Sequence, residues 1–314
     1  MEQLITILGP TAVGKTDLTL RLAKALNGVV ISGDAYQIYK GLNIGTAKPT
    51  VEELASVPHR LIDICEADDS YSVADFQRAA AQAITNAHLQ GQMPILSGGT
   101  GFYVQSLLEG FDFSVEGPDT SIRKRLEDMW VVDGENAVLA YGEQLAKKGQ
   151  ISLRFTDKHR LFRAIELMEQ GHYEALTNQT KAGLSYEGPV IGLRRNREEL
   201  YERINLRVEI MVEQGLFEEV ETLLASGISP DCQAFKGIGY KEVVAYYQGS
   251  YTKAEAIAAI QQNTRRFAKR QITWYKRMPY ITWLDCDNNR TSESVYEEAI
   301  TIIGAQLKVN KFNI

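Results

Sequence analysis

The stretch GPTAVGKT, at positions 9–16, fits the pattern G-x-x-x-x-G-K-[ST] without a mismatch. The apolar run LITILG precedes it, and helical spacing of Leu18, Leu22 and Leu26 follows it. Strand, glycine loop and helix form the context in which this motif binds phosphate, because backbone N–H groups and the helix N-terminus favour an anion. This context disfavours a glycine-rich turn with an accidental lysine. The predicted phosphate loop consists of Gly9, Pro10, Thr11, Ala12, Val13, Gly14, Lys15 and Thr16.

Two side chains of this loop have predicted roles. Lys15 is expected to reach the terminal phosphates, and the Thr16 hydroxyl is expected to bind Mg²⁺. The motif alone is typical of nucleotide-binding proteins, including ATP-binding enzymes, GTPases and kinases, which normally hold the metal with an Asp at the end of another strand. Here the run PILSGGTG ends in glycines and threonine, and a guanine-reading N-K-x-D is absent.

Asp34 is a carboxylate that does follow a predicted strand, in GVVISGD. A lone Asp in this position is most often a turn or cap residue. This strand, however, comes directly after the phosphate loop, and open α/β sheets bind ligands at the carboxyl ends of their strands. We therefore predict a functional role for Asp34, with an ordinary Asp pKa near ~4. Polar side chains follow it at Tyr36, Gln37, Tyr39, Lys40, Thr46 and Lys48.

Alternating strand and helix patterns predict the fold class. Strand-like runs occupy 28–34, 60–65 and 93–99, and an Ala-rich helical stretch, 73–90, lies between the last two. Strands that alternate with helices indicate parallel strands joined by crossover helices. We predict an α/β fold: a P-loop NTPase-like parallel sheet flanked by helices, with a helical insertion domain.

The insertion is predicted from a change in the sequence pattern. Residues 113–186 are polar and helical, and a core strand returns at 188–193. The expected organisation is a first part of the core at 1–112, the insertion at 113–186 and core completion at 187–314. The last part is expected to hold helices at 197–226 and 239–277, with a capping box from Thr252 to Glu255, then a strand at 280–284 and a helical tail.

Composition excludes several classes of protein. The 314 residues have a net charge of −6, which gives no global sign of nucleic-acid binding. Cys65, Cys232 and Cys286 form no C-x-x-C pair, so a disulfide framework or a zinc site is not expected. No apolar run approaches the ~20 residues that span a bilayer, and no secretory signal pattern is seen. We expect a cytoplasmic protein without a membrane partner.

Several segments together resemble one enzyme family. They are ISGDAYQIYKGLNIGTAKP, PHRLIDI, GGTGFYVQSLLEG, RLFRAIEL, REELYERINLRV, GIGYKEV and AKRQITW, in addition to the phosphate loop. Their order is similar to that of the bacterial tRNA dimethylallyltransferases, without the zinc finger of many eukaryotic members. The resemblance implies that dimethylallyl diphosphate, and not ATP, occupies the phosphate loop. It further implies transfer of the prenyl group to N6 of adenosine 37, next to the tRNA anticodon.

The resemblance also implies roles for individual residues. Asp34 is implied as the general base for the adenine amine, Thr100 as a residue that helps to hold the flipped adenosine, and Arg207 as a diphosphate ligand beside Lys15 and Thr16. Many members have Asp-Ser where this chain has Asp34-Ala35. The implied tRNA contacts are Asp34, Ala35, Tyr36, Gln37, Thr100, Arg123, His159, Arg160, Leu161, Phe162, Arg163, Lys236, Gly237, Ile238, Gly239 and Tyr240.

The chemistry of prenyl transfer needs the residue types found here. The exocyclic amine of adenine is a weak nucleophile, so the site needs a proton acceptor and a cationic cradle for the leaving diphosphate. On the predicted helix, Arg203 lies four residues after Glu199, an arrangement typical of a surface ion pair. Arg207 has no carboxylate three or four residues away, which favours an anion ligand from elsewhere.

A basic stretch near the C-terminus predicts RNA contact. TRRFAKRQITWYKR, residues 264–277, places Arg265, Lys269 and Lys276 on one helical face and Arg266, Arg270 and Arg277 on an adjacent one. Such a stretch is most often a solvated helix face. In a chain of net negative charge, however, six neighbouring cations favour contact with an RNA phosphate backbone. Stacking of Trp274 on a base is not expected.

Two other functions compete with the transferase at this point. A small-molecule kinase would use ATP, and the helical insertion could be its lid. An RNA-binding module would keep only a vestigial nucleotide site. The expected partners are the anticodon stem-loop of tRNA and dimethylallyl diphosphate, with Mg²⁺ as cofactor and a monomer as the working form. Whether ATP or ADP can accept the prenyl group stays open.

Overall fold

The computed structural model describes residues 1–113, 117, 119–152, 154, 157–177 and 183–307. The chain divides into two compact units, one formed by Met1–Leu108 with Leu184–Ile314 and the other by Glu109–Gly183. The insertion was predicted at 113–186, and this second unit spans 109–183. Among the described residues, no helix has both the length and the apolar character needed to cross a membrane.

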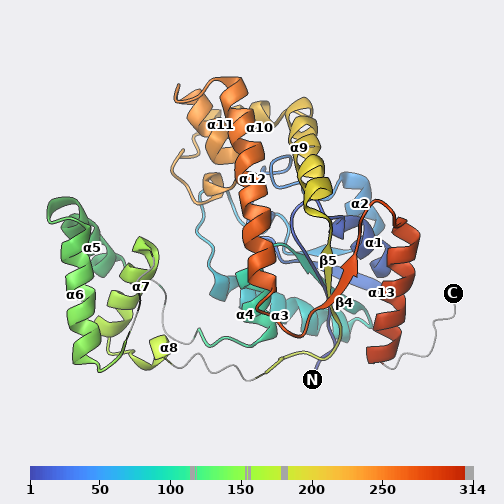
Figure 1. Ribbon diagram of the computed structural model, residues 1–314, viewed down its shortest axis with the longest axis horizontal. Helices are drawn as coiled ribbons and strands as arrows, with labels where there is room; N and C mark the ends of the chain where they lie inside the picture. The colour runs from blue at the N-terminus through green and yellow to red at the C-terminus, as the bar shows by residue number, and fades with distance from the viewer. Residues whose placement is uncertain (114–116, 118, 153, 155–156, 178–182, 308–314) are drawn as a thin grey trace. The chain divides into compact units, whose positions relative to one another are not determined.

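The first unit is built on a six-stranded sheet with the order β3-β2-β4-β1-β5-β6. All neighbouring strands are parallel, so the predicted parallel α/β sheet is confirmed (Figure 1). The chain leaves the sheet after β4 and returns to it with β5. The strands are β1 Ile5–Leu8, β2 Gly28–Ser32, β3 His59–Arg60, β4 Met93–Gly98, β5 Val190–Arg194 and β6 Thr282–Asp285.

The strand predicted at 60–65 is wrong over most of its length. β3 contains only His59 and Arg60. Leu61 and Asp63 have φ angles of 61° and 54°, which an extended strand cannot accommodate. Cys65 still forms an isolated parallel bridge with Tyr39. Apolar composition alone did not reveal this turn.

Helices lie on both sides of the sheet and beyond its carboxyl-end edge. Gly215, at φ 98°, separates α9 from α10, so the predicted helix 197–226 is two helices. The predicted helix 239–277 is interrupted too, and the capping box between Thr252 and Glu255 is confirmed at the start of α12. The helices of this unit are α1 Lys15–Ala25, α2 Val51–Ser56, α3 Val73–Leu89, α4 Gly101–Leu108, α9 Arg197–Glu213, α10 Leu216–Ala225, α11 Tyr240–Tyr247, α12 Lys253–Tyr275 and α13 Ser292–Leu307, with a 3₁₀ turn at Ala234–Lys236.

Side chains along each strand alternate between the two faces of the sheet, so the core forms two layers. Ile5 and Ile7 of β1 pack with residues of α1 and α13, whereas Leu4 and Leu8 pack with residues of α3 and α4. Successive strand residues point to opposite faces, and both faces of a parallel sheet need a cover. A third cluster joins α10, α11 and the start of α12 to residues 36–44.

The second unit is helical among its described residues. Leu126, Val138, Leu161, Phe162 and Ile165 are buried together at its centre. Asp157 caps the third helix, because its carboxylate accepts a hydrogen bond from the Arg160 N–H at 2.9 Å. The helices are α5 Thr120–Val132, α6 Glu135–Lys148, α7 Lys158–Glu169 and α8 Glu174–Thr177.

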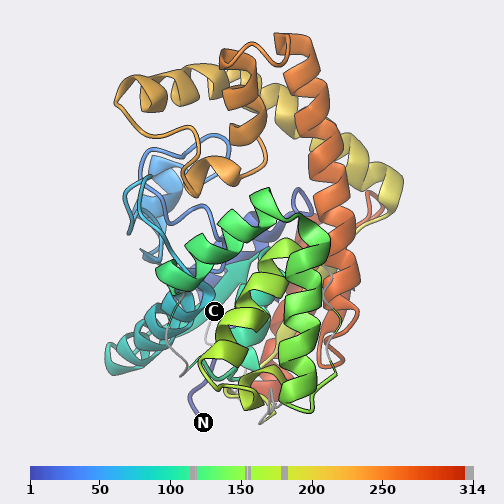
Figure 2. The same cartoon turned by 90° about the vertical axis from the view of Figure 1, so that its left-hand side faces the viewer.

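The arrangement of the first unit leaves one edge of the sheet free to bind a ligand. In Figures 1 and 2, α9, α10, α11 and α12 extend beyond the ends of the strands, with α12 alongside α9. The phosphate loop follows β1 at this edge, and the segment after β2 begins there as well. Residues far apart in the sequence therefore meet at the carboxyl ends of β1, β2 and β4, where ligands bind in open α/β sheets.

Candidate active site

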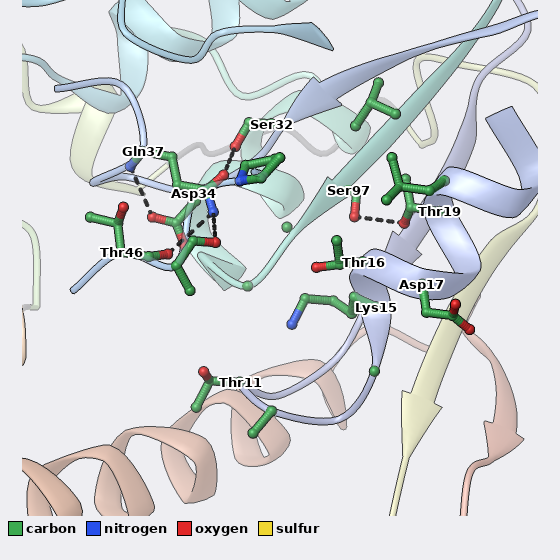
Figure 3. A pocket seen from close by; sticks show the side chains of 18 of the residues that line it. Thr11, Lys15, Thr16, Asp17, Thr19, Ser32, Asp34, Gln37, Thr46 and Ser97 are labelled. Carbon is green, nitrogen blue, oxygen red and sulfur yellow. Dashed lines mark hydrogen bonds between the residues drawn. The ribbon is translucent and has the colours of Figure 1, made fainter. Parts of the chain in front are cut away.

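A cavity of about 310 Å³ lies at this edge, entirely within the first unit. Its wall includes the phosphate loop, Asp34 after β2, Arg203 and Arg207 of α9, residues of α12, and Thr46, Ala47 and Pro49. Figure 3 shows Lys15 and Thr16 on the opposite side of the pocket from Asp34 and Gln37. The phosphate loop and Asp34, which the sequence predicted separately, therefore share one cavity.

The backbone of the phosphate loop is held by a close approach at Gly9 and by hydrogen bonds from Lys15. Gly9, at φ 153°, could not carry a side chain, because a Cβ would lie 2.7 Å from the Leu193 carbonyl oxygen. The Lys15 ammonium donates hydrogen bonds to the carbonyl oxygens of Gly9 and Pro10, each at 2.9 Å. Burial, and then the nearby Arg207 charge, lower the pKa of Lys15 to about 7. An anion in the cavity would favour the charged form of Lys15.

Asp34 lines the cavity and is held there by two backbone N–H groups. Its Oδ1 accepts hydrogen bonds from the backbone N–H groups of Tyr36 at 2.8 Å and Gln37 at 3.3 Å. Burial raises the pKa of Asp34, and these N–H groups with Lys15 and Arg207 offset part of the rise. The expected ordinary pKa of Asp34 is therefore corrected upward, because desolvation depends on burial in the folded chain. A higher pKa makes the carboxylate a stronger base.

Thr100 lies next to Asp34, although it does not line the cavity. Its hydroxyl accepts a hydrogen bond from the Ala35 N–H at 3.1 Å, and its own N–H donates to the Gly33 carbonyl at 3.3 Å. The two chain segments approach closely here, since a Cβ on Gly98 would lie 2.4 Å from the Gly33 oxygen. Thr100 thus holds the backbone that carries Asp34 and Ala35.

Two arginines of α9 line the cavity. Burial lowers the pKa of Arg207, and Asp34 counteracts this effect. Arg207 forms no hydrogen bond or ion pair with any residue that the structure describes, which leaves its guanidinium free for an anion. The surface pair predicted between Arg203 and Glu199 is wrong. Glu199 instead pairs with Arg195 at 3.2 Å, and Arg203 Nε donates to the Ala12 carbonyl at 2.9 Å.

Gln271 is a site residue that the sequence analysis missed. It is buried on α12, where its Oε1 accepts a hydrogen bond from the Thr11 N–H at 3.0 Å and its Nε2 donates to the Gly99 carbonyl at 2.7 Å. The Tyr275 hydroxyl, one helical turn later, donates to the same carbonyl at 2.8 Å. The i, i+4 spacing of two hydrogen-bonding side chains in RQITWY was the available signal. α12 thus joins the phosphate loop to the GGTG turn.

Gln37 closes the other side of the cavity. Its Oε1 accepts a hydrogen bond from the Ser32 hydroxyl at 2.8 Å, and its Nε2 donates to the carbonyls of Thr46 and Ala47, both at 3.2 Å (Figure 3). The side chain of this predicted tRNA contact is therefore engaged within the protein. Gln37 fixes the segment that forms the cavity wall.

The site suits magnesium held with the help of a phosphate. Thr16 lines the cavity, and its hydroxyl has no hydrogen-bond partner among the residues described. The described chain contains no group of three His, Cys, Asp or Glu residues arranged for a metal. Mg²⁺ commonly binds through few protein ligands together with substrate phosphates and water. A single threonine hydroxyl beside the phosphate loop fits this mode.

The segments 34–37 and 236–240 lie together. A Cβ on Gly237 would lie 3.1 Å from the Tyr36 ring, so the turn that contains Gly237 passes directly over that ring. The turn after Lys236 is thereby brought against Tyr36, two residues after Asp34. The predicted tRNA contact of the Tyr240 side chain is corrected, because this side chain is 1% exposed and its hydroxyl is bound within the protein.

The predicted contacts in the second unit divide into exposed and buried residues. His159 and Arg160 are exposed on α7. Leu161 and Phe162 are core residues there, so their side chains are not available to RNA. The resemblance implied contacts from the whole run 159–163, whereas α7 exposes His159 and Arg160 and buries Leu161 and Phe162.

Arg123 and Arg163 also lie in the second unit, and both contact the buried Glu166. Arg123 binds its carboxylate at 2.7 and 3.2 Å, and Arg163 lies 3.5 Å from it. A fully buried carboxylate needs such partners, because an unpaired charge in the core is costly. The position of both guanidinium groups is therefore set by the interior of this unit.

The basic stretch forms the end of α12 and the turn after it. Arg265 is half-buried and donates a hydrogen bond to the Asn205 side chain. Contrary to the prediction, it therefore does not share an exposed face with Lys269. Trp274 packs against Gly101 and Phe102. The cations exposed along this stretch are Arg266, Lys269, Arg270, Lys276 and Arg277.

Residues 37–278 match the family model described as IPP transferase. The tRNA dimethylallyltransferase of Bacillus cytotoxicus is 42% identical over 296 residues, with 93% of each chain covered. That of Alkaliphilus metalliredigens is 40% identical over 296 residues, which cover 94% of this chain and 95% of that protein.

Solved structures agree with these relatives. The full-length tRNA isopentenylpyrophosphate transferase from Bacillus halodurans is 40% identical and has a TM-score of 0.74, with 98% of both chains covered. A eukaryotic dimethylallyltransferase acting on tRNA has a TM-score of 0.81 at 24% identity, which shows a common fold. Because the family model spans most of the sequence and the relatives cover nearly all of it, this chain belongs to the IPP transferase family.

Proposed function

We propose that the protein transfers a dimethylallyl group from dimethylallyl diphosphate to N6 of adenosine 37 in tRNA. One observation carries this proposal: the phosphate loop and the basic carboxylate of Asp34 share a single cavity. Such a site can bind a diphosphate and accept a proton from a nucleophile. The names of the relatives, tRNA dimethylallyltransferases, support the choice of donor and acceptor.

The proposed reaction is a displacement at C1 of the donor. The adenine N6 forms a bond to C1, while the bond from C1 to the diphosphate oxygen breaks and its electron pair leaves with the diphosphate. Asp34 accepts the proton that the amine loses. The hydrogen bonds from Tyr36 and Gln37 hold one carboxylate oxygen, which leaves the other oxygen to face the amine.

The protein stabilises the leaving group with cations and backbone dipoles. The proposed diphosphate ligands are the N–H groups of the phosphate loop, Lys15 and Arg207. The Thr11 N–H is excluded, since it already donates to Gln271. Thr16 would hold Mg²⁺, and a bound Mg²⁺ would neutralise part of the diphosphate charge.

The target adenine has to leave its stack to reach this cavity. We propose that Asp34, Ala35 and Thr100 receive it, while the segment 236–239 and the exposed cations of α12 contact the surrounding RNA. His159 and Arg160 are proposed as contacts from the second unit. In this proposal the enzyme works as a monomer, and in the cytoplasm, where tRNA is found.

A direct assay separates this function from a small-molecule kinase and from an RNA-binding module. The protein is incubated with labelled dimethylallyl diphosphate or labelled ATP, each with and without tRNA. We expect label in the tRNA only with the prenyl donor, and diphosphate release that depends on tRNA. Phosphate release from ATP with a small acceptor would support a kinase, and RNA binding without any turnover would support a binding module.

The affinity for dimethylallyl diphosphate is expected to fall as the pH rises above about 7. The pKa of Lys15 is about 7 in the free protein, and a bound diphosphate would raise it. Lys15 then takes up a proton on binding, so affinity falls by up to about tenfold per pH unit above the free pKa. The measurement is the donor dissociation constant from about pH 6 to 9.

Lys15→Arg is the matched control for this experiment, because a guanidinium stays charged throughout. The ratio of the two dissociation constants removes the titration of the diphosphate itself. A ratio that stays constant over this pH range would contradict a role for the Lys15 charge.

Replacing Arg266, Lys269 and Arg270 with Gln is expected to weaken RNA binding in a salt-dependent way. These side chains are exposed along α12 and form no ion pair with described residues. Each lost phosphate contact makes the slope of log affinity against log salt shallower by about 0.7 to 0.9. We expect a slope shallower by about two units, measured with a bare anticodon stem-loop.

Thermal stability should barely change in this variant, because exposed charges contribute little to folding. An unchanged salt slope would show that α12 is only a solvated face. The RNA would then have to be held by the segment 236–239 and the second unit.

A further inference from the structure

Glu219, on α10, binds two separate segments of the first unit with one carboxylate. The N–H groups of Asn43 and Ile44 donate to Oε2 at 3.0 and 2.9 Å. The Tyr240 hydroxyl donates to Oε1 at 2.6 Å, and the Gly45 N–H lies 3.5 Å from the same oxygen. Neither the sequence motifs nor the proposed reaction gave this residue a role.

Gly45 and Tyr240 contact each other as well as Glu219. The Gly45 N–H donates to the Tyr240 hydroxyl oxygen at 3.1 Å. A Cβ on Gly45 would lie 2.5 Å from the Tyr240 ring, so only glycine allows this approach. Tyr240 is 1% exposed, and its ring is part of the cluster formed with α10 and α11. Carboxylate, phenol and backbone therefore form one closed network.

The segment that this network holds continues directly into the cavity wall. Thr46 and Ala47 line the cavity, and Ala47 has a φ of 47°, a strained value for a residue with a side chain. Gln37 binds the carbonyls of both residues from the cavity side. Glu219 fixes the residues immediately before them, so the wall is held from two directions.

The network also reaches the proposed RNA surface. Tyr240 is the last residue of the segment 236–240, and Gly237 of that segment packs on Tyr36. Any displacement of this segment therefore acts on Glu219 through the Tyr240 hydroxyl, and through Glu219 on the residues before Thr46.

We propose that Glu219 is a positioning residue for the prenyl donor. It holds the Thr46–Ala47 wall of the cavity in place and ties that wall to the segment 236–240. The inference rests on the proposed function, because it identifies the cavity as the donor site.

The donors around this side chain match a carboxylate better than an amide. Both oxygens of Glu219 accept hydrogen bonds from N–H or O–H donors, and it forms no ion pair within the described chain. Glutamine has the same shape, but one of its oxygens is replaced by an NH₂ group, which cannot accept. Glu219→Gln therefore places a donor against either the Asn43 and Ile44 amides or the Tyr240 hydroxyl.

The test compares Glu219→Gln and Tyr240→Phe with Tyr247→Phe in the full chain. Tyr247 is a matched control, because its hydroxyl joins α11 to α10 through the Phe217 carbonyl at 3.1 Å and touches neither segment. The first measurement is amide hydrogen exchange of residues 43–47. We expect exchange to accelerate at least about tenfold in Glu219→Gln, and less in Tyr240→Phe, with no change in Tyr247→Phe.

The second measurement is steady-state prenyl transfer to tRNA. For Glu219→Gln we expect the KM for dimethylallyl diphosphate to rise about tenfold while kcat stays within about threefold, because the cavity wall is displaced but Asp34 is not. Tyr240→Phe should give a smaller rise in KM. Tyr247→Phe should match the wild type in both constants.

Two results would overturn the inference. In the first, KM stays within about twofold of the wild type although exchange has accelerated. In the second, kcat falls with an unchanged KM and a lower melting temperature, which is the pattern of a smaller folded fraction. Wild-type protein that transfers no prenyl group would refute the proposed function instead, and the exchange measurement would still show whether Glu219 holds residues 43–47.

Discussion

Asp34→Asn is expected to lower the turnover of prenyl transfer by about two to four orders of magnitude. The amide oxygen can still accept the hydrogen bonds of the Tyr36 and Gln37 N–H groups, so the local backbone should keep its conformation. What is lost is the basic oxygen, whose proton affinity is increased because burial raises the pKa of Asp34. The measurement is the single-turnover rate at saturating donor and tRNA.

Binding of tRNA should survive this substitution, since phosphate contacts supply most of the affinity for RNA. Asp68→Asn is a suitable control, because Asp68 is an exposed carboxylate that forms no hydrogen bond or ion pair with any described residue. If the Asp34 variant turns over within about threefold of the wild type, Asp34 is not the proton acceptor.

Lys15→Ala and Arg207→Ala are each expected to lower kcat/KM for dimethylallyl diphosphate by about 10- to 100-fold. Both cations line one cavity and are proposed to bind one diphosphate, so each removes a charged hydrogen bond to the same ligand. The double variant should lose less than the sum of the two single free-energy changes, because the ligand is already loosened in either single variant.

The pH of this experiment matters, since Arg207 lowers the pKa of Lys15. Removing Arg207 near neutral pH would leave Lys15 more fully protonated and would mask part of the loss. At about pH 6, Lys15 is protonated with or without Arg207, so the coupling in the donor dissociation constant then reports the shared ligand, without the effect of either cation on the pKa of Asp34. Strict additivity under these conditions would place Arg207 outside the diphosphate site.

Arg197→Ala provides the control on the same helix. Arg197 begins α9, where its guanidinium lies 5.2 Å from the centre of the Tyr201 ring, and it does not line the cavity. Its kcat/KM should equal that of the wild type. A comparable loss of kcat/KM in this variant would show that the effect comes from disturbing α9 and not from losing a diphosphate ligand.

Predictions of local structure were confirmed where neighbouring residues encode every part of the motif. The phosphate loop needs only a strand, glycines and a helix in immediate succession, and each of these is encoded by neighbouring residues. The position of Asp34 opposite the loop followed from topology, because parallel strands bring their carboxyl ends to one edge. The strand at 60–65 failed because left-handed φ angles at non-glycine residues leave no clear mark in the sequence.

The sequence by itself therefore determined the parallel α/β core, the phosphate loop and the edge of the sheet where Asp34 lies. Only the tertiary structure decided which other side chains complete the site. Gln271 reaches Thr11 across 260 residues of sequence, and Glu219 reaches Ile44 across 175. Arg203 binds the phosphate loop, and it is Arg195 that pairs with the carboxylate of Glu199. The physical reason is that several partners compete for each polar group, and the folded chain selects among them by distance and burial, neither of which helical spacing reveals.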